Sequence, residues 1–182
     1  MKIFTNSQWE ELSLQGEVVI CGYYHRYRNK DGTHNTAFDM FSGRILDVKD
    51  KKEKGIRYFF NQLDDELCED IAICVVPSHE ASRRNSSGVS ILARELAANN
   101  RIDKVDFLQR IFTVDKLAHG GSRNISVHLD SIGTNADMSI AGDVVLLVDD
   151  VTTSGASLEA CKQILLENGA SRVAMLALGQ SI

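Results

Sequence analysis

The sequence has few of the features that mark linkers, disulfide frameworks and membrane spans. Its 182 residues include a single proline, Pro77, and no segment rich in proline or serine, so we expect one domain. Four scattered cysteines form no CxxC pair and no zinc-ligand spacing, which favours buried free thiols over disulfides. No run approaches the roughly 20 apolar residues of a membrane helix. The polar N-terminus shows no secretory signal, and we therefore expect a cytoplasmic protein.

The charge balance disfavours one class of function without excluding a local basic patch. The formal net charge is −5, which argues against a protein whose main task is to coat nucleic-acid phosphates. Hydrophobic residues make up 43% of the chain and charged residues 25%, as is typical of a globular domain. Aromatic and basic side chains alternate over Tyr23–Arg28, but on a strand half of them would simply pack. Nucleic-acid binding by this run is therefore the less favoured interpretation.

The first 70 residues carry mixed signals. Ser7–Glu10 has the Ser-x-x-Glu form of a capping box and predicts a short first helix. Residues 17–27 are rich in β-branched and aromatic side chains and predict a strand. A turn signal follows, and a second strand is expected over residues 37–48, which would complete a β-hairpin. Apolar residues at helical spacing then predict a helix over residues 56–67.

From residue 71 onward the pattern changes to buried strands that alternate with amphipathic helices. Continuous apolar runs predict strands and helically spaced apolar residues predict helices: strands over 71–76, 144–148 and 172–178, a further candidate strand within 104–113, and helices over 91–97 and 158–168. This alternation predicts an α/β fold, with a Rossmann-like parallel sheet flanked by helices on both faces.

The residues after the most hydrophobic strand predict a ligand site. Val145–Val148 leads into Asp149 and Asp150, and small, mostly hydroxylated residues then run over 153–157 into a helix. Ligands of parallel sheets bind beyond the carboxyl ends of the strands, and backbone N–H groups at a helix N-terminus favour an anion such as phosphate. The two carboxylates would repel that phosphate but would suit sugar hydroxyls or hydrated Mg²⁺. The stretch therefore predicts a site for a ribose 5-phosphate group.

Other interpretations of the same stretch explain less of it. A Walker A loop requires a lysine after Gly155, and none is present. A receiver domain also has an acidic pair after its first strand, but the downstream residues that it needs do not fit between Asp150 and the end of the chain. An ordinary strand–turn–helix with capping acids stays open, although a cap accounts for only one or two of these residues.

The stretch from Val145 to Ser157 resembles the phosphoribosyl pyrophosphate (PRPP) motif of type I phosphoribosyltransferases. That motif has four apolar residues, two acids and a Thr-Thr-Gly-x-Thr-like loop. Thr152 replaces the usual aliphatic residue, while Ser154 and Ser157 replace threonines and keep the hydroxyls. The resemblance implies that the acids contact the ribose hydroxyls and that the loop holds the 5-phosphate, through the set Asp149, Asp150, Thr152, Thr153, Ser154, Gly155, Ala156 and Ser157.

Weaker similarities extend upstream. Val76-Pro77-Ser78 with Arg83-Arg84 is similar to the pyrophosphate loop of the ComF-like branch of that family, and Arg110, Lys116 and Arg123-Asn124 to its flexible loop. The four-cysteine zinc module common in that branch is absent. The resemblance implies a PRPP-binding core over 71–182 and an N-terminal hood over 1–70. It also implies pyrophosphate contacts from Ser78, Arg83, Arg84, Lys116 and Arg123, with Lys116 and Arg123 as catalytic residues on a mobile lid over residues 113–128.

The resemblance further implies a function. A phosphoribosyltransferase would bind PRPP with Mg²⁺ and transfer the 5-phosphoribosyl group to or from a nitrogenous base or amine. The Mg²⁺ would be held mostly by the substrate and water, without a dedicated protein metal site, and a homodimer is compatible with this picture. The rival hypothesis is a non-catalytic protein that binds PRPP or ribose 5-phosphate as a regulator or partner protein, including one linked to nucleic-acid processes. Glu80 favours the rival, because its carboxylate would oppose a pyrophosphate group.

Overall fold

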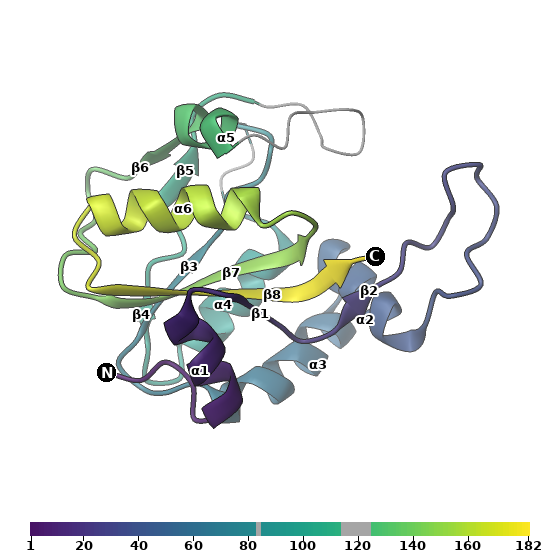
Figure 1. Cartoon of the computed structure of the whole chain (residues 1–182), viewed down its shortest axis with the longest axis horizontal. Helices are drawn as coiled ribbons and strands as arrows, with labels where there is room; N and C mark the ends of the chain where they lie inside the picture. The colour runs from purple at the N-terminus through teal and green to yellow at the C-terminus, as the bar shows by residue number, and fades with distance from the viewer. Residues whose placement is uncertain (83–84, 114–124) are drawn as a thin grey trace.

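The computed structural model describes residues 1–82, 85–113 and 125–182, and it shows a parallel sheet between two layers of helices (Figure 1). The sheet has the order β1-β8-β7-β3-β4, all strands are parallel, and β2 continues beside β8 where β1 ends. The predicted α/β fold with a parallel sheet is thereby confirmed. Its strands are β1 (Val18–Ile20), β2 (Tyr23–Tyr24), β3 (Ala72–Val75), β4 (Ile102–Asp103), β7 (Val144–Thr152) and β8 (Arg172–Ser181).

Alternating side chains of the strands build a separate core on each face of the sheet. Leu146 and Val148 of β7 pack with the helices of one face, whereas Val145 and Leu147 pack with those of the other. The first face carries α1 (Ser7–Gln15), α2 (Met40–Lys49), α3 (Glu53–Leu63), the 3₁₀ turn η1 (Asp64–Glu66) and α4 (Gly88–Ala97). The second carries α6 (Ala156–Glu167), the short α5 (Ile125–Ser131) and an antiparallel pair, β5 (Leu108–Arg110) and β6 (Ile132–Thr134).

The strand predicted over residues 37–48 is wrong, because this segment forms helix α2. The Asp39 side chain caps the helix by accepting a hydrogen bond from the Ser42 backbone N–H at 2.8 Å. Ser42, Ile45 and Val48 are buried at a spacing of three residues, which is a helical period. The expected β-hairpin is absent from the described N-terminal region, since β1 and β2 both pair with β8. Between β2 and α2 the chain instead makes a long excursion away from the body (Figure 1).

The first helix forms, but its capping differs from the predicted box. Asn6, rather than Ser7, caps α1, and its side chain accepts from the Gln8 and Trp9 N–H groups. The Glu10 carboxylate instead accepts from the backbone N–H of Ile3 and Phe4 and pairs with Arg172 at 2.6 Å. Glu10 therefore ties the N-terminus to β8, and a buried carboxylate with several donors replaces the reciprocal cap.

The C-terminal half follows the sequence pattern closely. Helices α4 and α6 cover the two helices predicted after residue 71, and Gly169 has a φ of 94°, as expected for the glycine that follows a helix. The candidate strand within 104–113 is reduced to β5, which leaves the main sheet and pairs with β6. All four cysteines are free, with Cys74 and Cys161 buried and Cys21 and Cys68 partly exposed. None of the helices in the described residues has the length and apolar character to cross a membrane.

Candidate functional site

The acidic pair lies on strand β7 itself and not in the loop after it. The strand was expected to end at Val148, but it continues to Thr152 and pairs with Gln180 of β8. Successive strand residues face opposite sides of a sheet. Asp150 accordingly meets Lys49 from α2, with 2.8 Å between Nζ and Oδ2, whereas Asp149 lies toward Cys161 of α6. The two carboxylates therefore flank the end of the strand, one on each face.

The two carboxylates differ in their electrostatic surroundings. Burial raises the pKa of Asp149 to about 7, and the negative charge of Asp150 adds to that rise. The positive charges of Lys49 and Arg110 lower the pKa of Asp149, as does the hydrogen bond that Asp149 Oδ1 accepts from the Asp150 N–H at 2.8 Å, but they do not cancel the rise. The end of β7 thus holds more negative charge than its described surroundings neutralise, which suits a ligand with hydroxyl donors or a cation.

The loop after β7 presents backbone donors to a ligand. Thr152 is buried, and its Oγ1 accepts the N–H of Gly155 at 3.1 Å, which closes the turn. Gly155 has a φ of 78°, a left-handed conformation that favours glycine, and helix α6 begins at Ala156. No side chain caps α6, so the first N–H groups of this 12-residue helix are left for an anion. The exposed hydroxyls of Thr153 and Ser154 stand at the same entrance.

The loop after β3 lies beside the loop after β7, because the two strands are parallel neighbours. The Val76 N–H donates to the Val148 carbonyl at 3.0 Å and extends the pairing one residue beyond β3, while β7 itself continues to Thr152. Arg110 of β5 then fixes the loop, since its Nε donates to the carbonyl of Ser78 at 3.0 Å and its Nη2 to that of Pro77 at 3.4 Å. The Arg110 side chain is buried, and burial lowers its pKa.

His128 of α5 contacts the phosphate loop from the other side. Its Nε2 lies 3.3 Å from Oγ of Ser157, in the first turn of α6. The ring is buried, Nδ1 has no hydrogen-bond partner, and burial together with the nearby charge of Arg110 lowers the pKa of His128. A neutral imidazole therefore orients the Ser157 hydroxyl, one of the groups predicted to hold the phosphate.

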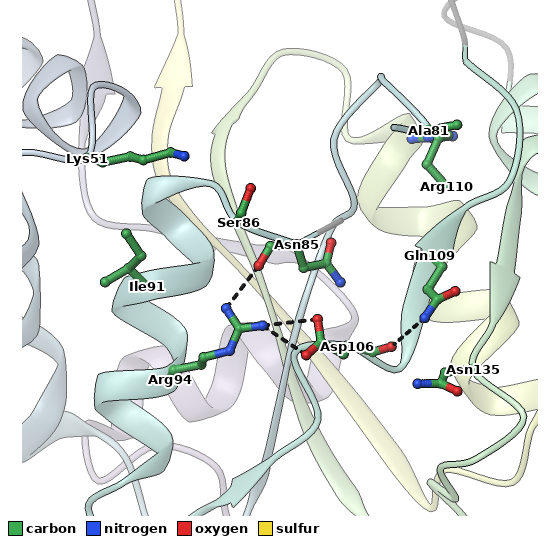
Figure 2. Close-up of a pocket in the computed structure, with 10 residues that line it drawn as sticks. All are labelled: Lys51, Ala81, Asn85, Ser86, Ile91, Arg94, Asp106, Gln109, Arg110 and Asn135. Carbon is green, nitrogen blue, oxygen red and sulfur yellow. Dashed lines mark hydrogen bonds and ion pairs between the residues drawn. The ribbon is translucent and has the colours of Figure 1, made fainter. Parts of the chain in front are cut away.

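A separate cavity of about 730 Å³ opens between α4 and β5 (Figure 2). Arg94 crosses it and forms a bidentate pair with Asp106, at 2.9 and 3.0 Å. Asn85 donates to the carbonyls of Val105 and Leu108. The principal polar groups of this cavity thus bind one another, and the acidic strand end is not among its described lining residues: Lys51, Ala81, Asn85, Ser86, Ile91, Arg94, Asp106, Gln109, Arg110 and Asn135.

The predicted site residues fall on three parts of the chain. The set from Asp149 to Ser157 runs from the end of β7 into α6, and Ser78 lies in the loop after the neighbouring strand β3. Arg83, Arg84, Lys116 and Arg123 lie outside the described residues, as does the core of the predicted lid. In the run at Tyr23–Arg28, Tyr24 is buried while Tyr23 and Tyr27 are exposed. Glu80, the residue expected to oppose pyrophosphate, lies 3.3 Å from His79 through Oε1 and Nε2.

Sequence reasoning missed three residues of the site. Lys49 directly follows the segment interpreted as a strand, and no local signal links it to a carboxylate about a hundred residues downstream. Arg110 was noted only as part of a flexible loop, yet it is a buried residue that orders the loop after β3. His128 was noted only as the last residue of the predicted lid. The one available signal was Arg110 itself, an arginine next to apolar residues in a candidate strand. If such a residue is buried it requires several hydrogen-bond acceptors.

The residues at the end of β7 fit a hydrated Mg²⁺ held mainly by a bound substrate. One partly neutralised carboxylate and one with a raised pKa offer oxygen ligands, but two carboxylates make an incomplete cation shell. Within the described ranges no group of three or more His, Cys, Asp or Glu side chains is placed to hold a metal ion. Asp150 is already paired with Lys49, so a substrate-bound Mg²⁺ would contact this chain through Asp149 or would have to share Asp150 with that lysine.

Comparison with known proteins gives similarities to solved structures alone. No protein-family model matches the chain, and no curated protein matches it. A hypoxanthine phosphoribosyltransferase from Staphylococcus aureus is similar at 14% identity and a TM-score of 0.42, covering 76% of this chain and 74% of that one. A purine phosphoribosyltransferase from Pyrococcus horikoshii is similar at 16% identity and a TM-score of 0.39, covering 77% and 82%.

A third similar structure is the phosphoribosylpyrophosphate synthetase from Mycobacterium smegmatis, at 18% identity and a TM-score of 0.37. The match covers 69% of the present chain, which spans about a third (31%) of the length of that synthetase. TM-scores below 0.5 carry no conclusion about activity or ligand. Function has to be inferred from the chemistry of the strand ends.

Proposed function

We propose that the chain is a phosphoribosyltransferase that binds PRPP together with Mg²⁺ at the carboxyl ends of β3 and β7. The observation that supports this best is the uncapped N-terminus of α6, reached through left-handed Gly155, immediately after a strand that ends in two carboxylates. The helix N-terminus suits a phosphate and the carboxylates suit sugar hydroxyls. A ribose 5-phosphate group offers both a phosphate and sugar hydroxyls.

The roles of the residues follow from this placement. The N–H groups and hydroxyls over residues 153–157 hold the 5-phosphate, and Asp149 and Asp150 accept from the ribose hydroxyls. The loop at Pro77 and Ser78, which Arg110 holds in place, lies next to them on the pyrophosphate side. We further assign Arg83, Arg84, Lys116 and Arg123 to the pyrophosphate, because guanidinium and ammonium groups suit its charge.

Transfer would break the bond between C1 and the pyrophosphate oxygen and form a bond from C1 to a nitrogen of the acceptor. The sugar becomes cationic at C1 during the exchange, as in glycoside cleavage. The protein then contributes orientation of the sugar, exclusion of water and positive charge near the departing pyrophosphate. Mg²⁺, when bound with the substrate, supplies further positive charge at the pyrophosphate. We also propose a cytoplasmic location, in keeping with the four free cysteines.

Two measurements test the proposal. Calorimetry is expected to show binding of PRPP with Mg²⁺ and of ribose 5-phosphate, and both affinities are expected to fall when Gly155 is replaced by Val. Release of ³²P-pyrophosphate from PRPP is then measured across a panel of purines, pyrimidines and amines. Release with one acceptor class supports the transferase. Absence of binding of either ligand would overturn the assignment of the site.

The second candidate is a protein that binds PRPP or ribose 5-phosphate without turning it over. The observation that favours it is the loop after β3, in which the backbone carbonyls of Pro77 and Ser78 face Arg110 and Glu80 adds negative charge. Such a loop offers pyrophosphate few donors among its described residues. Tight binding in calorimetry with no pyrophosphate release from any acceptor would select this alternative.

A further inference from the structure

A lysine from the N-terminal region occupies the position beside Asp150 where a cation would be expected. Nζ of Lys49 lies 2.8 Å from Oδ2 of Asp150, and both side chains are about one-third exposed or less (35% and 27%). Lys49 is the last residue of α2, where the negative end of the helix dipole favours a positive charge. The positive charge of Lys49 is therefore favoured both by the C-terminal end of α2 and by the carboxylate on β7.

The position of Lys49 is fixed by two close backbone approaches. A Cβ atom added to Gly88, at the start of α4, would lie 1.6 Å from the carbonyl oxygen of Val48. A Cβ atom added to Gly55 of α3 would lie 2.7 Å from the N atom of the same residue. Ile45 and Val48 are fully buried against the sheet. The last turn of α2 is therefore held between two helices, and Lys49 is delivered to Asp150 by a rigid element.

The chemistry of the pair determines what it can do. An ammonium group carries three donors, so Lys49 can keep Asp150 in place with one of them and offer another to a sugar hydroxyl or phosphate oxygen. A divalent cation that approached Asp150 would have to displace Lys49 or share the carboxylate with it. Like charges at such short range repel strongly in a partly buried site.

We propose that Lys49 is the resident counter-ion of Asp150, so that the site binds a ribose 5-phosphate ligand without a divalent cation. The choice of ribose 5-phosphate as the ligand rests on the function proposed above. The exclusion of a divalent cation by Lys49 does not depend on that function. The requirement for Mg²⁺ then belongs to the pyrophosphate of PRPP and not to the ribose carboxylates. Removing Lys49 opens the acidic strand end to metal ions.

The first test uses the ligand-free protein and Mn²⁺, whose free concentration is measured by electron paramagnetic resonance. Lys49→Met is expected to bind Mn²⁺ at least about tenfold more tightly than the wild type, since it removes a positive charge and uncovers the Asp150 carboxylate. The double variant Lys49→Met/Asp150→Asn should lose the gain. Lys54→Met removes the same charge from an exposed position on α3 and serves as the matched control. Equal Mn²⁺ affinity of the wild type and Lys49→Met would overturn the proposal.

The second test measures ribose 5-phosphate affinity by calorimetry in EDTA and in Mg²⁺. The wild type and Lys49→Arg are expected to bind equally in both, whereas Lys49→Met should bind about tenfold more weakly in EDTA and recover in Mg²⁺. A wild type that needs Mg²⁺ for ribose 5-phosphate would overturn the proposal. If no variant binds ribose 5-phosphate in either buffer, the proposed function fails, and the Mn²⁺ comparison still decides the role of Lys49.

Discussion

The loops after β7 and β3 end neighbouring parallel strands, yet they are held in place in different ways. The loop after β7 is closed by a bond between residues three apart, from the Gly155 N–H to Thr152 Oγ1, and it runs directly into α6. The loop after β3 depends on distant residues. Arg110 binds the carbonyls of Pro77 and Ser78 from 33 and 32 residues away.

Because the two loops are held differently, we expect mutations in them to affect different properties of the protein. A locally closed loop keeps its shape as long as its own residues and the following helix are intact, so its mutations should affect ligand binding first. A loop that is fixed by a buried arginine depends on the tertiary packing of β5 and α5, so its mutations should affect stability first. The four predictions below test or sharpen this contrast.

The largest effect is expected at Arg110. Arg110→Met leaves the carbonyls of Pro77 and Ser78 and the hydroxyl of Ser131 without their donor, and the free energy of unfolding should fall by about 3 kcal/mol. Urea denaturation measures the loss. Arg94→Met is the matched control, because Arg94 is more exposed, and it should cost about 1 kcal/mol. Equal losses from the two variants would mean that Arg110 does not hold the loop.

Gly155→Val should abolish binding of ribose 5-phosphate while the protein remains folded. A Cβ atom there meets nothing within 4 Å, so the cost is that of a left-handed backbone, about 1–2 kcal/mol of stability. Gly142 has a φ of 83° and equally open surroundings, which makes Gly142→Val a matched control. The two variants should have similar melting temperatures, and only Gly155→Val should lose the ligand in calorimetry. Loss of binding in both would point to general destabilisation.

Asp150→Asn should weaken ribose 5-phosphate binding by about 1–3 kcal/mol, the range of hydrogen bonds to charged groups. The wild type and the variant should become more alike when the ligand is the 2-deoxy sugar phosphate. Calorimetry with both ligands measures the four affinities. The same penalty for both ligands would show that this carboxylate does not bind the 2-hydroxyl.

The smallest effect concerns the pH dependence of stability. The pKa of Asp149 is raised to about 7 in the folded protein, so folding favours its protonated form. The stabilisation is full below the ordinary carboxyl pKa and is lost as the pH rises toward 7. Asp149→Asn should therefore raise the free energy of unfolding more at pH 8 than at pH 4, because the variant has no carboxylate to ionise in the folded state. Urea titrations at both pH values measure this, and a difference independent of pH would contradict the raised pKa.

The fold of the C-terminal half was predictable because its signals are local. Continuous apolar runs over β3, β7 and β8 identify strands that are covered on both faces, and a one-sided apolar pattern identifies α6. The segment that forms α2 was predicted to be a strand because β-branched and aromatic residues occur in both buried strands and buried helices. The choice was made by packing, since Ile45 and Val48 face the sheet only when the segment is helical.

The sequence by itself determined the parallel α/β fold and the strand–loop–helix arrangement around Gly155, because short-range periodicity and a contiguous run of small residues encode both. Tertiary structure alone decided how far β7 extends, which placed Asp149 and Asp150 on opposite faces of the sheet. It also decided that Lys49 and Arg110 join the site from α2 and β5. Residues so far apart along the chain come into contact only through the packing of whole helices and strands, and no local sequence pattern predicts such contacts.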